Sequence, residues 1–470
     1  MLFPTLTFAW FFFAVFILAW SLQRSNEWRK IILLAASWVF YGAWDWRFVA
    51  LLIASGVLNW GVARLIVGQG NREGARKALL LLGIAINLAI LGFFKYYGFF
   101  MEQVQGLLHG LGWERDLSIM QVVLPVGISF FTFQGMSYVI DVYRRRTEPA
   151  QLLDMVLLMS FFPHLVAGPI VRASHLIPQF KEAPRMTRGM AAMGILLIVW
   201  GLFKKAVIAS ELATGFVDPV FFDPGAHSST DLLAAAYGYA VQIYCDFSAY
   251  SDMAIGLAAL LGYRFPHNFN QPYRARSLQD FWRRWHISLS SWLRDYLYIS
   301  LGGSRHGLLR LCLALGTTML LGGLWHGASW NFVIWGALHG GVLAAERLWR
   351  EYKPKGAPKL PPFAGIIITF HIVLLGWIFF RAASFSDAVG FIGGIFGGTA
   401  VVATTVTPLV VALIVIGMAL HALPPRAIQH VAMRVRTMPA VLVGLGVGVL
   451  VLIIDSMRPE GVAPFIYYQF

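Results

Sequence analysis

Histidines buried in apolar segments are the residues of this sequence with the clearest capacity for chemistry. His326 stands in LLGGLWHGASWNF, between Trp325 and Gly327 and far from any charged residue. An imidazole in such surroundings is an uncharged base for which little water competes, and the glycines would let a ligand approach closely. We interpret His326 as a candidate catalytic base. The alternative is a histidine that only fills space in the protein interior.

A second histidine lies in an arginine-rich block, FWRRWHISLSSWLRDYLYI. Helical periodicity places His286 on one face with Trp282 and directs Arg283 and Arg284 elsewhere. Lysine is absent between residues 264 and 310, and guanidinium groups bind phosphate bidentately. Arg283 and Arg284 are therefore candidates for a phosphate-recognition surface on the cytoplasmic side. The alternative is an interfacial helix whose arginines reach lipid headgroups.

A third polar cluster interrupts an apolar run in VQIYCDFSAYSDMAIG. Asp246 and Tyr250 are four residues apart and share one face of a helix, and Asp252 follows closely. Ionisable groups in a membrane are costly, so each needs a partner or a role. These three residues either line a site or form a hydrogen-bonded knot between packed helices.

Composition places all three clusters in a membrane. The 470 residues are 58% hydrophobic and only 13% charged, about half the charged share of a soluble protein. A soluble enzyme, a nucleic-acid-binding domain and a disordered scaffold are excluded, and the net charge of +14 is typical of loops that set topology. Lipids are the expected surroundings. No residue spacing is typical of a metal site, so we expect no metal.

The distribution of charge predicts an all-α polytopic membrane protein with about ten to twelve crossings. The apolar start lacks the basic region of a cleavable signal peptide and is expected to be a retained span. Residues 152–170 are predicted to be re-entrant, 264–307 amphipathic and 308–349 a helical hairpin. We expect one membrane-embedded domain over 1–470, with both termini, including a short tail at 457–470, outside the cytoplasm.

Five blocks in order resemble the membrane-bound O-acyltransferase (MBOAT) family. They are LPVGISFFTFQ, FFPHLVAGPI, YCDFSAYSDMAIG, FWRRWHISLSSWLRDYLYI and the WHG triplet. The resemblance is greatest to the bacterial branch, whose members acylate alginate, peptidoglycan or teichoic acids. It implies a bundle of membrane helices with re-entrant and amphipathic segments around a central channel.

The resemblance also implies roles for single residues. His326 matches the near-invariant buried histidine of the family, and His286 matches its second histidine position. The arginine-rich block would lie near a cytoplasmic acyl thioester such as acetyl-CoA, a co-substrate and not a bound cofactor. The chain ends in PFIYYQF, similar to an aromatic tail whose tyrosine is proposed to carry the acyl group. That tyrosine corresponds to Tyr467, with Tyr468 as the alternative.

The function implied is transfer of an acetyl group across the bacterial inner membrane. A periplasmic or membrane-anchored acetyltransferase subunit would receive it and modify an alginate-like exported polysaccharide. Transfer of D-alanine, or transfer to peptidoglycan, would use the same machinery. A proton-coupled transporter or flippase would instead use the buried His and Asp residues as a relay. We find no inverted repeat, which argues against that class. A passive scaffold for a periplasmic partner is a third alternative.

Overall fold

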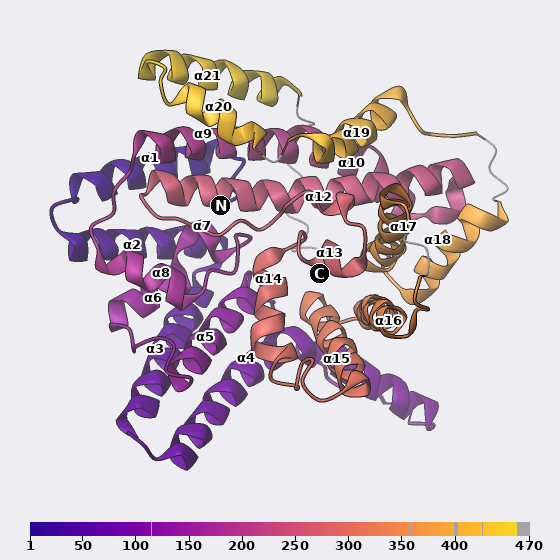
Figure 1. The fold of residues 1–470 in the computed structure, drawn as a ribbon, viewed down its shortest axis with the longest axis horizontal. Helices are drawn as coiled ribbons and strands as arrows, with labels where there is room; N and C mark the ends of the chain where they lie inside the picture. Colours follow the sequence, from indigo (N-terminus) through magenta and orange to yellow (C-terminus); the bar gives the residue numbers. More distant parts are fainter. Residues whose placement is uncertain (114, 357–359, 399–402, 425, 458–470) are drawn as a thin grey trace. The chain divides into compact units, whose positions relative to one another are not determined.

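The computed structural model describes residues 1–470 except 114, 357–359, 399–402, 425 and 458–470. The described residues form helices and no strand, which confirms the expected all-α fold (Figure 1). They group into two compact units, one of Met1–Thr187 with Ala258–Phe265 and the other of Arg188–Leu257 with Pro266–Phe470. The single-domain organisation stays a prediction, and the expected tail lies almost wholly outside the described residues.

The first unit is a group of helices of very unequal length. They are α1 (Leu6–Ser21), α2 (Asn26–Asp45), α3 (Arg47–Gly68), α4 (Glu73–Gly110), α5 (Ile128–Tyr143), α6 (Leu152–Ser160), α7 (Phe162–Leu165) and α8 (Ala173–Lys181). Helices α3, α4 and α5 pack against one another. The predicted break in 152–170 is confirmed, because α6 ends at Ser160 and only a single turn, α7, follows.

Buried polar pairs join the helices of this unit. Asn59 and Asn87 exchange side-chain hydrogen bonds of 3.2 and 2.9 Å between α3 and α4. Lys30 of α2 lies 2.7 Å from Asp154 of α6, and both side chains are at most 2% exposed. An apolar surrounding offers no water to these groups, so each side chain meets its need for a hydrogen bond or an opposite charge within its pair.

The second unit contains all the predicted site residues that the structure describes. Its elements are α9 (Arg188–Leu202), η1 (Phe203–Ala209), α10 (Ser210–Leu212), η2 (Ala213–Val217), α11 (Asp218–Phe222), η3 (Pro224–Ala226), α12 (Ser229–Leu260, the last turn belonging to the first unit), η4 (Pro272–Arg274), α13 (Leu278–Trp282), α14 (Ile287–Trp292), η5 (Leu293–Tyr298), α15 (Leu308–His326), α16 (Trp330–Tyr352), α17 (Pro362–Arg381), α18 (Phe385–Gly397), α19 (Pro408–Ala419), η6 (Leu420–Ala422), α20 (Ala427–Val435) and α21 (Ala440–Met457).

Six described helices are long and apolar enough to cross a membrane, and up to seven if one bent pair counts as a span. They are Arg47–Gly68, Glu73–Gly110, Arg188–Phe222, Leu308–His326, Pro362–Arg381 and Ala440–Met457, with Pro408–Ala422 and Ala427–Val435 as the bent pair. The chain is therefore a multi-pass membrane protein. The larger number counted in the sequence included shorter apolar helices such as α1, which has 16 residues, and helices with buried charges such as α12.

The arginine-rich block is not one continuous helix, contrary to the periodicity argument. Helix α13 ends at Trp282 and α14 begins at Ile287. His286 lies between them with φ 43° and ψ 54°, in the left-handed region that a helix cannot continue through. Trp282 and His286 therefore do not share a helix face.

The predicted hairpin of α15 and α16 is confirmed, and glycines let its helices approach closely (Figure 1). A Cβ on Gly336 would lie 2.5 Å from the Met319 carbonyl oxygen, and one on Gly340 would lie 3.0 Å from the Cα of Gly316. Small residues allow this backbone contact between membrane helices. His326, the last residue of α15, is held in place by this packing.

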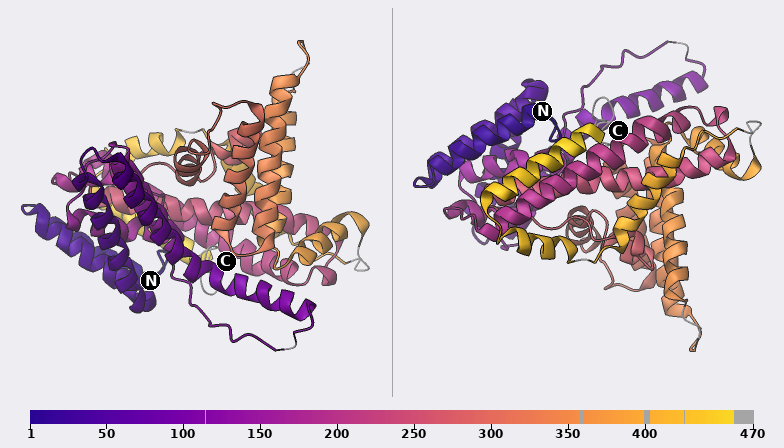
Figure 2. Two further views of the ribbon diagram at one scale, coloured as in Figure 1. Left: turned by 90° about the horizontal axis from the view of Figure 1, so that it is seen from below. Right: turned by 90° about the horizontal axis from the view of Figure 1, so that it is seen from above.

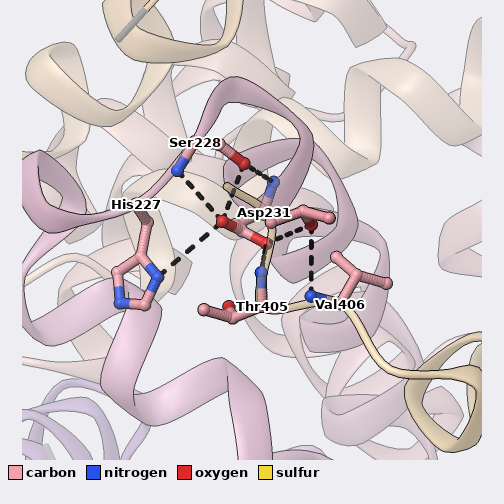
Figure 3. A network of polar contacts seen from close by, with 6 residues as sticks. His227, Ser228, Asp231, Thr405 and Val406 are labelled. Carbon is pink, nitrogen blue, oxygen red and sulfur yellow. Dashed lines mark hydrogen bonds and ion pairs between the residues drawn. The ribbon is translucent and has the colours of Figure 1, made fainter. Parts of the chain in front are cut away.

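The amino end of α12 is fastened by a buried carboxylate (Figure 3). Asp231 accepts hydrogen bonds from the backbone N–H and hydroxyl of Ser228, at 3.0 and 2.7 Å. It also accepts from the Thr404 hydroxyl at 2.7 Å and from the Thr405 N–H at 2.8 Å. The side chain of Asp231 is fully buried. It therefore joins α12 to the segment that leads into α19.

We predict that Asp231→Ala lowers the free energy of unfolding by about 1–3 kcal/mol, because buried donors lose their acceptor. Thermal unfolding of the purified protein in detergent would measure it. Asp387→Ala is a matched control, since Ser384 and Asp387 repeat the local hydrogen bonds of Ser228 and Asp231 on the surface. Equal effects of the two substitutions would contradict the fastening role.

Candidate active site

His326 lies in an aromatic cage at the carboxyl end of α15. Its side chain is buried, and the ring centroids of Trp325, Trp335 and Phe380 lie 5.0, 5.0 and 5.1 Å from its own. The burial expected from the sequence is therefore present. Hydrogen bonds to an imidazole are stronger in such an apolar site than in water.

The glycines beside His326 serve packing within the protein, not the approach of a ligand. A Cβ on Gly327 would overlap the ring of Phe332, and one on Gly323 would overlap the carbonyl oxygen of the same residue. The space that these glycines leave is therefore filled by the first turn of α16. This corrects the expectation that their role is to admit a substrate.

His286 is completely buried and lies close to Trp325, one of the rings of the His326 cage. The centroid of the Trp325 ring lies 6.1 Å from that of His286 and 5.0 Å from that of His326. The ring of Phe247 in α12 lies edge-on to His286 at 4.6 Å. Burial lowers the pKa of His286 to about 3, so the imidazole is neutral at physiological pH. The structure thus brings the two predicted histidines onto one tryptophan.

The residues that hold His286 were not identified from the sequence. Asn268 Oδ1 lies 3.2 Å from His286 Nδ1, and it accepts hydrogen bonds from the backbone N–H and hydroxyl of Ser288 at 3.1 and 2.8 Å. Its Nδ2 donates to Ser251 Oγ of α12 at 3.0 Å. An asparagine in the loop sequence PHNFNQPY gives no periodic signal, so only the fold reveals this contact.

Two lysines that the sequence analysis passed over face the polar cluster of α12. Lys204 Nζ lies 2.8 Å from Asp252 Oδ2, and Lys205 Nζ lies 2.9 Å from Asp246 Oδ1. Lys205 also lies over the ring of Tyr250, 5.7 Å from its centroid, as expected if Asp246 and Tyr250 share a face. The signal was present in the sequence, since two lysines in an apolar run require two acidic partners.

The lysines sit in a local widening of their helix. The backbone adopts π-helical hydrogen bonding over Phe203–Ala209, a rare feature often found at functional sites. Both consecutive lysine side chains reach α12 from this turn and are at most 2% exposed. Of the cluster on α12, Asp246 and Asp252 pair with this turn, whereas Ser251 contacts the loop that carries Asn268.

The two neighbouring arginines predicted to bind phosphate differ in their surroundings. Arg284 Nε donates to Asp280 Oδ1 at 2.8 Å and is partly buried. Arg283 is exposed, and within the described ranges no acidic residue forms an ion pair with it. Arg283 is therefore the more available of the two for an anionic ligand. Tyr467 and Tyr468 lie outside the described residues.

The fold and the site define a class of protein: a multi-pass membrane enzyme with a buried histidine pair. Residues 128–386, more than half of the chain, match the membrane-bound O-acyltransferase family. The chain belongs to this family and is an O-acyltransferase. This membership favours acyl transfer over the transporter, flippase and scaffold alternatives.

Curated relatives show the same membership over most of the chain. It is 41% identical to the probable alginate O-acetylase AlgI of Azotobacter vinelandii over 391 residues, 83% of this chain and 76% of the relative. It is 37% identical to the peptidoglycan O-acetyltransferase of Helicobacter pylori over 413 residues, 82% and 77% of the two chains. It is 27% identical to the teichoic acid D-alanyltransferase of Bacillus subtilis over 276 residues, 55% and 69%.

We predict that Lys205→Met destabilises the protein by about 3–5 kcal/mol, because it leaves Asp246 buried without its cation. The double substitution Lys205→Met with Asp246→Leu should recover most of the loss. Unfolding in detergent would measure both. Lys204→Met is the matched control and should cost less, since its partner Asp252 has a side chain 23% exposed. A double variant no more stable than the single one would refute the pairing.

Proposed function

We propose that this enzyme transfers an acetyl group from cytoplasmic acetyl-CoA to a hydroxyl acceptor outside the cytoplasm, for O-acetylation of an exported polysaccharide. The observation that carries the proposal is the His326 cage, buried against the same tryptophan as His286. The named activities of the O-acetylase and O-acetyltransferase relatives support acetyl as the group. Alginate, or a similar polymer, is the proposed final acceptor.

In this proposal His326 acts as general base. A hydroxyl oxygen attacks the thioester carbonyl, the C–S bond breaks, and the hydroxyl proton passes through His326 to the leaving thiolate. A free hydroxyl is far too weak an acid for an imidazole to deprotonate in advance, since a Tyr hydroxyl has a pKa near 10 and a His near 6.5. Proton transfer therefore accompanies attack.

We propose supporting roles for the other predicted site residues. His286, beside Trp325, orients one of the reacting groups. Asp246, Tyr250 and Asp252 act at a distance, because their contacts with the lysines hold α12 where Ser251 meets Asn268. Arg283 binds the phosphates of the donor on the cytoplasmic side, and Arg284 shapes that surface through its contact with Asp280.

The proposal for the acceptor of the acetyl group is based on the sequence alone. We propose that the protein lies in a bacterial inner membrane with both termini in the periplasm, and that Tyr467 takes the acetyl group there. A periplasmic or membrane-anchored acetyltransferase subunit would then receive it. D-alanine from a carrier protein is the second candidate acyl group, favoured only by the more distant teichoic acid relative.

We expect His326→Gln to lower acetyl transfer by about 10²- to 10⁴-fold, the usual cost of losing a general base. The measurement is release of CoA from acetyl-CoA, together with acetylation of the polysaccharide, at equal amounts of folded protein. His430→Gln is the control, because that histidine is exposed on α20. Wild-type turnover in His326→Gln would reject the assignment.

Arg283→Gln should raise the Michaelis constant for acetyl-CoA roughly tenfold, as expected for a lost charge-assisted contact to phosphate. Turnover should change much less, because the contact binds the ground state and the transition state alike. The adjacent Arg284→Gln serves as the matched control and should have the smaller effect, since Asp280 already engages that guanidinium. Identical Michaelis constants in wild type and Arg283→Gln would leave Arg283 as a lipid-facing arginine.

A further inference from the structure

The hydrogen bonds of Asn268 determine which way its carboxamide faces. The backbone N–H of Ser288 lies 3.1 Å from one terminal atom of the amide. A backbone N–H can only donate, so this atom must be the oxygen Oδ1. The other terminal atom is then Nδ2, which donates to Ser251 Oγ. Exchanging the two atoms would place two donors against each other at Ser288.

This orientation fixes the proton on His286. Its Nδ1 lies 3.2 Å from Asn268 Oδ1, an atom that only accepts. Nδ1 must therefore carry a hydrogen, and in a neutral imidazole Nε2 is then an acceptor. Burial keeps the ring neutral, as its lowered pKa indicates. The tautomer of His286 thus follows from the backbone N–H of Ser288, which can only donate a hydrogen bond.

The segments that contain Asn268 and His286 are locked together by the main chain as well. The Asn268 carbonyl accepts from the N–H of Ile287 at 2.9 Å, and Asn270 N–H donates to the Arg284 carbonyl at 2.8 Å. His286 itself has the unfavourable φ of 43°, a strain that persists only where neighbours enforce it. Strain combined with complete burial marks a position under constraint.

We propose that Asn268 is a positioning residue of the acyl-transfer site, which holds His286 as the Nδ1–H tautomer so that Nε2 accepts a hydrogen bond from the acceptor hydroxyl as that hydroxyl binds, before the same proton turns to His326 during attack. This inference rests on the proposed function. Of the reacting groups, the hydroxyl is the one that has a proton to donate, whereas the thioester carbonyl needs a donor. An acceptor nitrogen at Nε2 therefore matches the hydroxyl and not the carbonyl.

The groups around His286 allow a test based on the pH dependence of turnover. Three aromatic rings pack against His286. They are Phe247 of α12, Phe269 of the loop that carries Asn268, and Trp325 of α15. Besides tyrosines and cysteines, α12 carries Asp246 and Asp252, each paired with a lysine, and Asp231, which is hydrogen-bonded to Ser228 and Thr404; α15 carries Arg310 and His326. A carboxylate introduced at position 268 would be the group in direct contact with Nδ1, and it would stabilise the imidazolium.

The experiment compares Asn268→Asp with Asn268→Leu in the full chain, by CoA release from acetyl-CoA in membranes that contain the acceptor. Asn268→Asp should lose at least about tenfold in turnover near pH 6 and recover as the pH rises. Asn268→Leu should lose a similar factor at every pH, because its His286 has no tautomer preference. The Michaelis constant for acetyl-CoA should stay within about twofold in both, since the donor is not the group that His286 contacts.

Asn270→Asp is the matched control, with the same change of charge on an exposed side chain of the same loop. It should keep the wild-type pH profile. A purely structural role of Asn268 predicts less folded protein with unchanged turnover per folded molecule, or equal pH-independent losses in both variants. Either result would overturn the inference while wild-type turnover stands. Absence of CoA release by the wild type would instead refute the proposed function, and the inference with it.

Discussion

The need of every buried charge for a partner is the constraint on which the site depends. Two lysines inside an apolar span require two carboxylates, and α12 supplies them as Asp246 and Asp252. Once α12 is held in this register, Ser251 meets Asn268, and Asn268 meets His286. The two ion pairs therefore help to set the position of His286. Through α12, the two lysines are connected to Ser251, Asn268 and His286.

Aromatic rings form the apolar surroundings of the two histidines. Trp325 lies near both histidines, and Trp335 and Phe380 complete the cage around His326. The faces of these rings present no competing hydrogen-bond partners, so the few hydrogen bonds that the imidazoles form are stronger than they would be in water. The site thus combines an apolar wall with a small number of fixed polar contacts, as ligand sites generally do.

Much of this arrangement could be predicted from the sequence, because a membrane makes polar residues conspicuous. The burial of His326, the hairpin around it and the break within 152–170 followed from apolar runs and their interruptions. The break at His286 could not be predicted, since periodicity does not register a single left-handed residue. The difference between Arg283 and Arg284 depends on where Asp280 points, which is a matter of side-chain geometry. The need of Lys204 and Lys205 for acidic partners could have been predicted from their position in an apolar run, but the sequence does not say which acidic residues they meet.

Helix α21, which follows all the site residues that the structure describes, covers the widened turn that carries the lysines. Ile454 of α21 packs with Ala206 and Val207 of that turn, and Figure 2 shows α21 running along this part of the helix. During translation the widened turn therefore enters the bilayer well before its cover exists. Lipid must shield it in the interval, and the mature packing around the lysines is finished only after residues 440–457 have been made. Premature termination before residue 440 would leave a protein with every histidine in place and its supporting helix uncovered.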